Sequence, residues 1–150
     1  MFTSQLNYLI NSDLKLKNNF VGVFPRDKLP KLDKGSCLIL NTHDSYKEGE
    51  HWLAIYVDAL GNGSFFDSYG NHPNRFNLID YLNSNCIKWE YNRVQLQGIS
   101  QMCGEYCALF LYFRIRNDLR KFYSFFDSNF YFNDLKIKKL IEFYFNKNAI

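Results

Sequence analysis

The pattern of apolar and polar positions predicts several β-strands in the first two-thirds of the chain. The clearest is His51–Val57 (HWLAIYV), an apolar and aromatic run that follows a polar loop over residues 41–50. Cys37–Leu40 is a compact apolar segment typical of a buried strand, and Phe20–Phe24 is a shorter strand ended by Pro25. We expect these segments to form one small sheet.

A hairpin is predicted next. Gly61–Gly63 (GNG) is a turn signal, and Ser64–Asp67 returns as the partner of the strand at residues 51–57. Trp89–Leu96 is a further strand candidate with a mixed pattern. A tight turn brings the end of the returning strand beside the start of the first.

Helical spacing of apolar residues marks the remaining elements. Residues 4–14 predict a short N-terminal helix capped by Ser4, and residues 76–82 carry a helical face after Pro73. Residues 117–133 are rich in aromatic side chains and receive no assignment.

Residues 103–116 (CGEYCALFLYFRIR) are apolar on most sides, which predicts a central, buried helix. Residues 134–145 predict an amphipathic helix with Asp134 near its start, where a negative charge suits the helix dipole. The expected fold is α+β: a small, mainly antiparallel sheet packed on the central helix, forming a single domain over residues 1–150.

Composition narrows the class of protein. The 150 residues, 47% of them apolar, are enough for one core. The first residues lack the pattern of a secretory signal, and no apolar run approaches the roughly 20 residues that span a bilayer. We therefore expect a soluble, intracellular, monomeric protein with no membrane partner, whose four cysteines are reduced.

Charge is uneven along the chain. The net charge is +3, and residues 114–150 hold eight Lys or Arg against four Asp or Glu. A basic C-terminal quarter is compatible with contact to nucleic acid or another acidic partner, although such a bias is more often a solvated helix face.

Cys103 is the candidate nucleophile. It opens the predicted central helix, where the positive end of the helix dipole favours a thiolate. A buried, inert thiol is the commoner situation for a lone cysteine, so this position needs supporting residues.

His51 and Asp67 are the candidate base and its orienting acid. His51 opens the main strand, and histidine titrates in the range that general-base catalysis near neutral pH requires. Asp67 ends the paired strand, so its carboxylate is expected beside the imidazole.

Gln97, six residues before Cys103, could donate its amide to an oxyanion together with the Cys103 backbone N–H. Trp52 and Gly104, the neighbours of the base and of the nucleophile, are expected to contact the substrate. No metal site is predicted.

The order and spacing of these residues resemble the adenovirus-type maturation proteases, within the superfamily of SUMO-specific cysteine peptidases. The resemblance covers roughly residues 20–115, and it is carried by Phe20–Phe24 followed by Pro30, Leu40–Thr42, Gly49–Trp52, Phe66–Gly70, the Gln97–Gly98 pair and Cys103–Cys107. It implies the protease fold, a Cys-His-Asp triad with Gln97 as oxyanion donor, and cleavage after small residues such as Gly. Processing of capsid precursors in a virion or viral factory follows from it, in a DNA virus, virophage or polinton-like element.

Two further expectations follow from the resemblance alone. Cys86 stands where the adenoviral enzymes have a cysteine that forms a disulfide with an activating peptide, and the basic C-terminal region could bind DNA as a cofactor. The acid is Asp67, whereas the adenoviral enzymes use Glu and the SUMO-specific peptidases use Asp. No cofactor is required by the sequence itself.

Other functions stay open. A peptidase that removes ubiquitin-like modifiers would share every catalytic residue. A zinc-binding or non-catalytic interaction module could use Cys103 and Cys107, one helical turn apart, but this spacing with scattered histidines is a poor zinc signature. An inactive protease-like binding domain is disfavoured because all four catalytic residue types are present.

Overall fold

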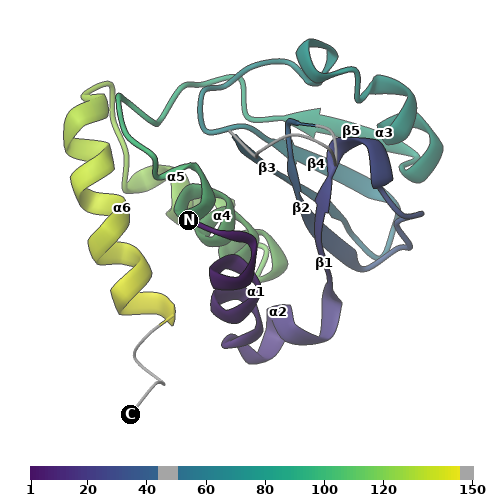
Figure 1. The fold of residues 1–150 in the computed structure, drawn as a ribbon, viewed down its shortest axis with the longest axis horizontal. Helices are drawn as coiled ribbons and strands as arrows, with labels where there is room; N and C mark the ends of the chain where they lie inside the picture. Colours follow the sequence, from purple (N-terminus) through teal and green to yellow (C-terminus); the bar gives the residue numbers. More distant parts are fainter. Residues whose placement is uncertain (44–50, 146–150) are drawn as a thin grey trace.

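The computed structural model describes residues 1–43 and 51–145 of the chain. A curved sheet lies on one side of the molecule and a group of helices on the other (Figure 1). In chain order the elements are α1 (Thr3–Asn11), α2 (Leu14–Asn19), β1 (Phe20–Pro25), η1 (Arg26–Lys28), β2 (Ser36–Asn41), β3 (Trp52–Val57), β4 (Asn62–Phe66), η2 (Pro73–Phe76), α3 (Ile79–Asn85), β5 (Lys88–Tyr91), α4 (Cys103–Ile115), α5 (Leu119–Ser124) and α6 (Phe130–Phe145).

The sheet follows the order of the chain, β1-β2-β3-β4-β5. The pairs β2/β3 and β3/β4 are antiparallel, whereas the outer pairs β1/β2 and β4/β5 are parallel. The α+β class is confirmed, and the sheet is mixed, with an antiparallel centre. The parallel outer pairs arise because the connections before β2 and β5 cross back along the sheet, through η1 and α3 respectively.

Side chains of the central strands alternate between two cores, as the period of a β-strand requires. In β3, Trp52, Ala54 and Tyr56 face the cluster under α4, and the intervening residues face the cluster under α3. Because both faces are covered, every residue of β3 is buried. This explains why the strand reads as an unbroken apolar run instead of an alternating one.

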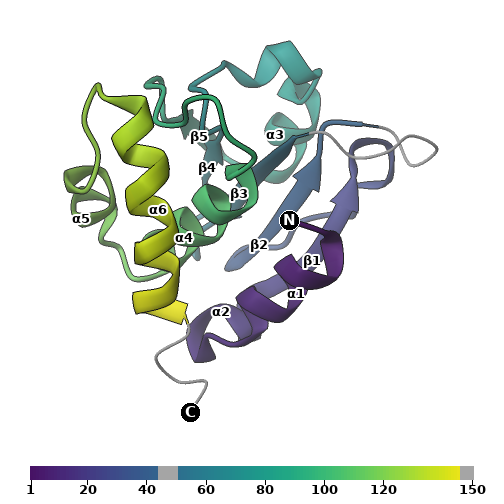
Figure 2. The same cartoon turned by 60° about the vertical axis from the view of Figure 1, so that its left-hand side comes forward.

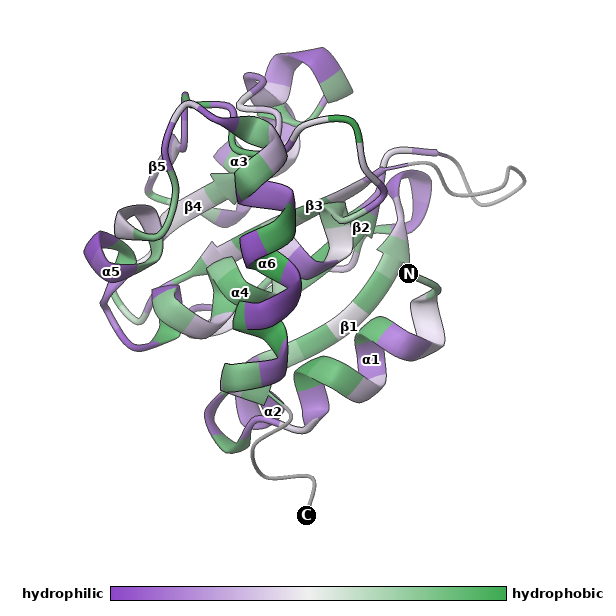
Figure 3. Ribbon diagram, turned by 90° about the vertical axis from the view of Figure 1, so that its left-hand side faces the viewer, coloured by the Kyte–Doolittle hydropathy of each residue, from purple (hydrophilic) through white to green (hydrophobic). Residues whose placement is uncertain are grey.

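The predicted central helix is α4, and Cys103–Phe113 is buried along its length. It packs on β3 and is covered by α5 and α6 (Figure 2). Coloured by hydropathy, α4 is largely hydrophobic, while the outer helix α6 carries hydrophilic and hydrophobic residues together (Figure 3). The prediction of a buried helix is confirmed.

Several predicted boundaries are wrong by a few residues. α1 begins at Thr3, so Ser4 does not cap it; Gln5 Oε1 instead accepts the N–H of Phe2 at 2.7 Å. The hairpin turn lies at Asp58–Gly61, since Asn62 and Gly63 already belong to β4.

Two further differences lie in the second half of the chain. β5 covers only Lys88–Tyr91, because the following residues leave the sheet to hold the candidate site. α6 begins at Phe130, four residues before the predicted start, and the unassigned aromatic segment contains α5. Most of the predicted polar loop, residues 44–50, lies outside the described residues.

Candidate active site

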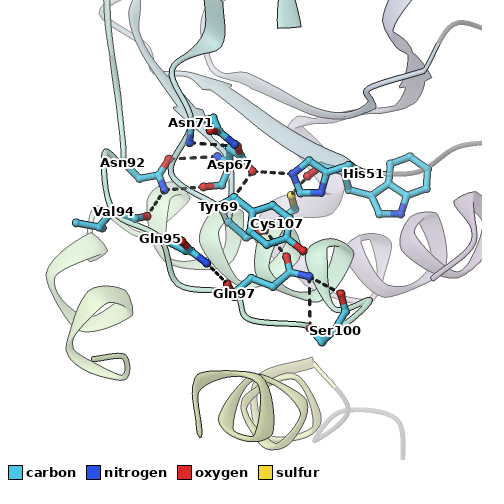
Figure 4. Close-up of polar contacts among 12 residues, drawn as sticks. His51, Asp67, Tyr69, Asn71, Asn92, Val94, Gln95, Gln97, Ser100 and Cys107 are labelled. Atoms are coloured by element: carbon cyan, nitrogen blue, oxygen red, sulfur yellow. Dashed lines mark hydrogen bonds and ion pairs between the residues drawn. The ribbon is translucent and has the colours of Figure 1, made fainter. Parts of the chain in front are cut away.

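His51 and Asp67 form the centre of the site (Figure 4). Ala54 pairs with Phe66 in the β3/β4 ladder, so one further step places Asp67 opposite Leu53, two residues from His51. Residues two apart on a strand share one face of the sheet, and diagonal neighbours lie within side-chain reach. His51 Nε2 accordingly lies 2.6 Å from Asp67 Oδ1. The predicted proximity of these two side chains is present in the structure.

The Asp67 carboxylate is fully buried and accepts several hydrogen bonds. Oδ1 accepts the N–H of Tyr69 at 3.0 Å as well as the His51 ring, and Oδ2 accepts the backbone and side-chain N–H groups of Asn71 at 3.2 and 2.8 Å. Burial alone would raise the pKa of Asp67, but the bonds from His51, Tyr69 and Asn71 and the charge of His51 hold it below its ordinary value. Asp67 is therefore an anion fixed in one orientation.

Asn92 holds the backbone on which Asp67 sits. Its Oδ1 accepts the Asp67 N–H at 3.1 Å, and its Nδ2 donates to the Asp67 carbonyl at 2.7 Å and to the Val94 carbonyl at 3.0 Å. Asn92 comes just after β5, so the edge of the sheet and the acid are joined by one side chain.

The turn after Asp67 depends on Gly70, whose φ is +75°. A Cβ added there would lie 2.6 Å from the backbone carbon of Val94. Glycine is required on both counts, because side chains disfavour this backbone region and no space exists for a methyl group. The close approach of the Gly70 and Val94 backbones packs the turn against the segment that leads to Gln97.

His51 lies between Asp67 and Cys103. Its side chain is 15% exposed. Burial lowers the pKa of His51, but hydrogen bonds with Asp67 and Cys103 and the charges of both residues outweigh burial and raise the pKa to about 9. With Nε2 bound to Asp67, Nδ1 is the ring atom left for the thiol. The raised pKa favours the imidazolium form of His51.

Cys103 is the first residue of α4 and is 7% exposed. The backbone N–H groups of the first helical turn point toward this end, where negative charge is stabilised. Cys107, one turn further on, is fully buried, and its Sγ donates to the Trp52 carbonyl at 3.3 Å. Burial raises the pKa of Cys107 well above its ordinary value, which disfavours its thiolate.

Gln97 lies in the same cleft as His51 and Cys103, which has a volume of about 1090 Å³. Its Oε1 accepts the Ser68 hydroxyl at 2.5 Å, and its Nε2 donates to the Ser100 carbonyl at 2.9 Å, with a longer contact of 3.3 Å to Ser100 Oγ. The acceptor end of the amide is thereby anchored away from the cleft, and one N–H remains weakly engaged.

Trp52 and Gly104, the two residues predicted to contact the substrate, differ in their surroundings. Trp52 lines the cleft and donates its ring N–H to the Met1 carbonyl at 3.1 Å. A Cβ at Gly104 would lie 3.2 to 3.4 Å from atoms of Leu6, Trp52 and Met1, so this glycine permits close packing of the N-terminal segment on α4. The space beside Gly104 is occupied by the protein itself.

Cys86 is half-buried at the end of α3, outside the residues that line the cleft. Its Sγ would lie 2.4 Å from a Cβ at Gly63 of β4, so the thiol faces the sheet. Burial and the charge of Asp58 raise the pKa of Cys86. A disulfide with an activating peptide stays a prediction for this residue.

The residues that support the site carry little sequence signal. Asn71, Asn92 and Ser68 contact Asp67 or Gln97, but polar residues in loops are ordinary in any sequence. Among the described residues, no group of three His, Cys, Asp or Glu side chains is arranged to hold a metal ion.

A cleft that brings a cysteine at a helix start, a histidine and a buried carboxylate together has the residue arrangement of the thiol hydrolases. Comparisons with known proteins agree. The chain is 29% identical over 117 residues to the protease of bovine adenovirus 2 and 30% identical over 118 residues to that of human adenovirus B serotype 3. Each match covers 67% of this chain, and 57% and 56% of the two relatives. The chain is a homologue of the adenovirus proteases and spans little more than half of their length.

The comparisons with family models and with solved structures say less about function. No family model matches the chain. The central domain of an uncharacterized Legionella pneumophila protein has a similar fold, with a TM-score of 0.53 and 13% identity over 95% of this chain and 97% of that domain. A crystal structure of a protease of ASFV matches with a TM-score of 0.42 and 25% identity, covering 54% of this chain and 35% of the other.

Proposed function

We propose that this chain is a cysteine endopeptidase in which Cys103 is the nucleophile, His51 the proton carrier and Asp67 the orienting acid. The observation that carries the proposal is the position of His51, which is bound at 2.6 Å to a buried carboxylate and lines the same cleft as Cys103 at the start of α4. Homology to adenoviral proteases supports the choice of a peptide bond as the substrate.

In the proposed reaction the Cys103 thiolate attacks the carbonyl carbon of the scissile bond, and the carbonyl electron pair moves to oxygen. His51 gives its proton to the leaving nitrogen as the C–N bond breaks, which leaves an acyl-thioester and a free amine. Water then attacks the thioester carbon and yields its proton to His51. The C–S bond of the tetrahedral intermediate then breaks and releases the carboxylic acid, while His51 keeps the proton from water, which restores the thiolate–imidazolium pair.

The oxyanion that forms in both steps needs donors. The backbone N–H of Cys103 is one, and the Gln97 amide is the other, because its 3.3 Å contact to Ser100 Oγ is long enough to be exchanged for a stronger acceptor. The bond from Ser68 holds the amide oxygen and so keeps the N–H₂ group turned toward the cleft.

For the substrate we propose polypeptides cleaved after small residues such as Gly, and specifically capsid precursors during maturation of a virus or virus-like element. The cleft walls support an extended peptide, since they combine aromatic residues, Trp52, Tyr69 and Phe76, with polar groups from β2 and the 97–101 segment. None of the helices in the described part of the chain is long and apolar enough to cross a bilayer.

DNA as a cofactor would have to use the basic C-terminal region. Two of its charges are engaged internally: Arg114 binds Asp58 at 3.2 Å, and Arg116 binds Asp13 at 2.7 Å. The ammonium of Lys136 on α6 donates to the Phe125 carbonyl at 3.1 Å, so the exposed Lys138 and Lys139 fit a phosphate backbone better.

The test is reaction with an electrophilic peptide ending in Gly-Gly, followed by mass spectrometry. We expect labelling of the wild type and of Cys107→Ala, and no labelling of Cys103→Ala. Equal labelling of the two variants would overturn the assignment of the nucleophile. Cleavage of folded ubiquitin-like conjugates in preference to capsid-type peptides would replace viral maturation with modifier removal as the function.

A further inference from the structure

The C-terminal helix α6 contacts the short segment that carries Gln97. The carbonyl of Leu96, directly before Gln97, accepts the side-chain N–H of Asn133 at 3.0 Å. The N–H of Gly98, directly after Gln97, donates to the Asp134 carboxylate, whose two oxygens lie at 3.2 and 3.1 Å. Neighbouring residues of one helix therefore hold the backbone on both sides of the proposed oxyanion donor.

Asp134 also contacts the nucleophile helix. The hydroxyl of Tyr106, which lies on α4 one turn after Cys103, donates to Asp134 Oδ1 at 2.8 Å. One carboxylate thus joins the Gln97 segment to the helix that begins with the nucleophile. The distance between the two proposed oxyanion donors, the Gln97 amide and the Cys103 N–H, depends on this link.

The fit between α6 and the segment is close and specific. A Cβ at Gly98 would lie 3.0 Å from both Asp134 Oδ2 and Phe130 Cβ, so any larger residue would require these neighbours to shift away from the backbone. Asn133 is fully buried, and its other bonds go to the backbone of Asp127, at 2.8 and 3.2 Å. Its side chain has no freedom to turn away from Leu96.

The opposite side of the segment is held by the turn that contains Asp67. The carbonyl of Ser68 accepts the N–H groups of Leu96 and Gln97 at 2.8 and 3.1 Å. Gln97 therefore lies on a strip of backbone fixed between the acid's turn and α6. In Figure 4 the segment with Gln97 and Ser100 passes between the Asp67 turn and the yellow ribbon of α6.

We propose that Asp134, together with Asn133, is a positioning residue for the oxyanion site: α6 holds the Gln97 amide at the distance from Cys103 that acyl transfer requires. This inference rests on the proposed function and adds a role for a helix that contributes no reacting group. Misplacing a preorganised donor by a fraction of its bond length weakens the stabilisation of the developing oxyanion more than it weakens substrate binding.

The test compares Asp134→Ala with Glu142→Ala, a matched loss of an exposed carboxylate on the same helix. In Asp134→Ala we expect kcat for peptide cleavage to fall by about 10- to 100-fold with little change in KM. Alkylation of Cys103 by iodoacetamide, which forms no oxyanion, should stay within about twofold of the wild type. Glu142→Ala should match the wild type in both assays.

Two further measurements separate this role from a general loss of structure. Amide hydrogen exchange of residues 96–100 should accelerate in Asp134→Ala and not in Glu142→Ala. The double variant Gln97→Ala/Asp134→Ala should be no slower in cleavage than Gln97→Ala, because Asp134 acts through Gln97. If Asp134→Ala fails to fold, Asp134→Asn, which keeps the shape and one acceptor oxygen, serves in the same assays with smaller effects.

Parallel loss of cleavage and alkylation, unchanged exchange in residues 96–100, or additive effects in the double variant would overturn the proposal. If the wild type cleaves no peptide, the proposed function fails. In that case the exchange measurement still decides whether Asp134 holds the Gln97 segment.

Discussion

The Asp67→Asn substitution probes the electrostatics of the site most directly. Asp67 Oδ1 faces the N–H of His51 and that of Tyr69, and Oδ2 faces two N–H groups of Asn71. An amide in place of the carboxylate must turn its own N–H₂ group toward one of these pairs of donors. If it faces His51, Nε2 must become an acceptor, and the proton moves to Nδ1, where it opposes proton transfer from the thiol.

The size of the effect follows from the pKa of His51. A rise from the ordinary 6.5 to about 9 corresponds to roughly 3 kcal/mol in favour of the imidazolium, at about 1.36 kcal/mol per pH unit. Burial opposes this preference and Cys103 contributes to it, so 3 kcal/mol is the net effect of the site on the His51 charge and not the share of Asp67 alone. The pKa of His51 is raised by folding, so this stabilisation is fully present below pH 6.5 and is lost as the pH rises through about 9.

Urea unfolding of the wild type and Asp67→Asn between pH 6 and pH 10 measures this contribution. The difference in free energy of unfolding should be largest at pH 6 and shrink by roughly 3 kcal/mol by pH 10. Asp118→Asn, which removes an exposed carboxylate at the start of α5, should show no such trend. A difference between wild type and Asp67→Asn that does not vary with pH would refute the ion pair. Cleavage should fall by about 10³- to 10⁴-fold at neutral pH.

Two further predictions concern the turn after the acid. Both Gly70 and Gly35 have positive φ, but only a Cβ added at Gly70 would meet backbone, that of Val94 at 2.6 Å. Gly70→Ala should therefore lower the free energy of unfolding by at least about 2 kcal/mol more than Gly35→Ala. Equal losses in urea titrations would contradict the steric argument. Asn71→Ala removes a hydrogen bond that lowers the pKa of Asp67, so the acid limb of the pH–rate profile should move to higher pH. An acid limb at the same pH as in the wild type would show that Asn71 does not lower the pKa of Asp67.

Much of the fold was predictable because it depends on local periodicity. The β3 and α4 segments are apolar on most sides, which is typical of elements that are covered by the rest of the protein; both are buried, as was predicted for α4. The boundaries were less predictable. β5 ends at Tyr91 because Asn92 is drawn into hydrogen bonds with Asp67, and no local pattern announces a contact between positions 25 residues apart.

The candidate site likewise has features that the sequence predicted and features that only the tertiary structure shows. The spacing of His51, Asp67 and Cys103 relative to predicted strands and a predicted helix was sufficient to propose all three, because a hairpin and a helix start are local features that fix where a side chain begins. Their mutual distances, the burial of Asp67 and the raised pKa of His51 arise only when β3, β4 and α4 meet.

The sequence by itself therefore determined the class of fold, the identity of the candidate triad and the relation to adenovirus proteases. Tertiary structure alone decided why Gly104 is a glycine and that α6 reaches the Gln97 segment through Asn133 and Asp134. The physical reason is the separation of the contacting residues along the chain. Residue spacing encodes the period of a strand or helix, whereas these contacts join backbone atoms to side chains more than 30 residues away.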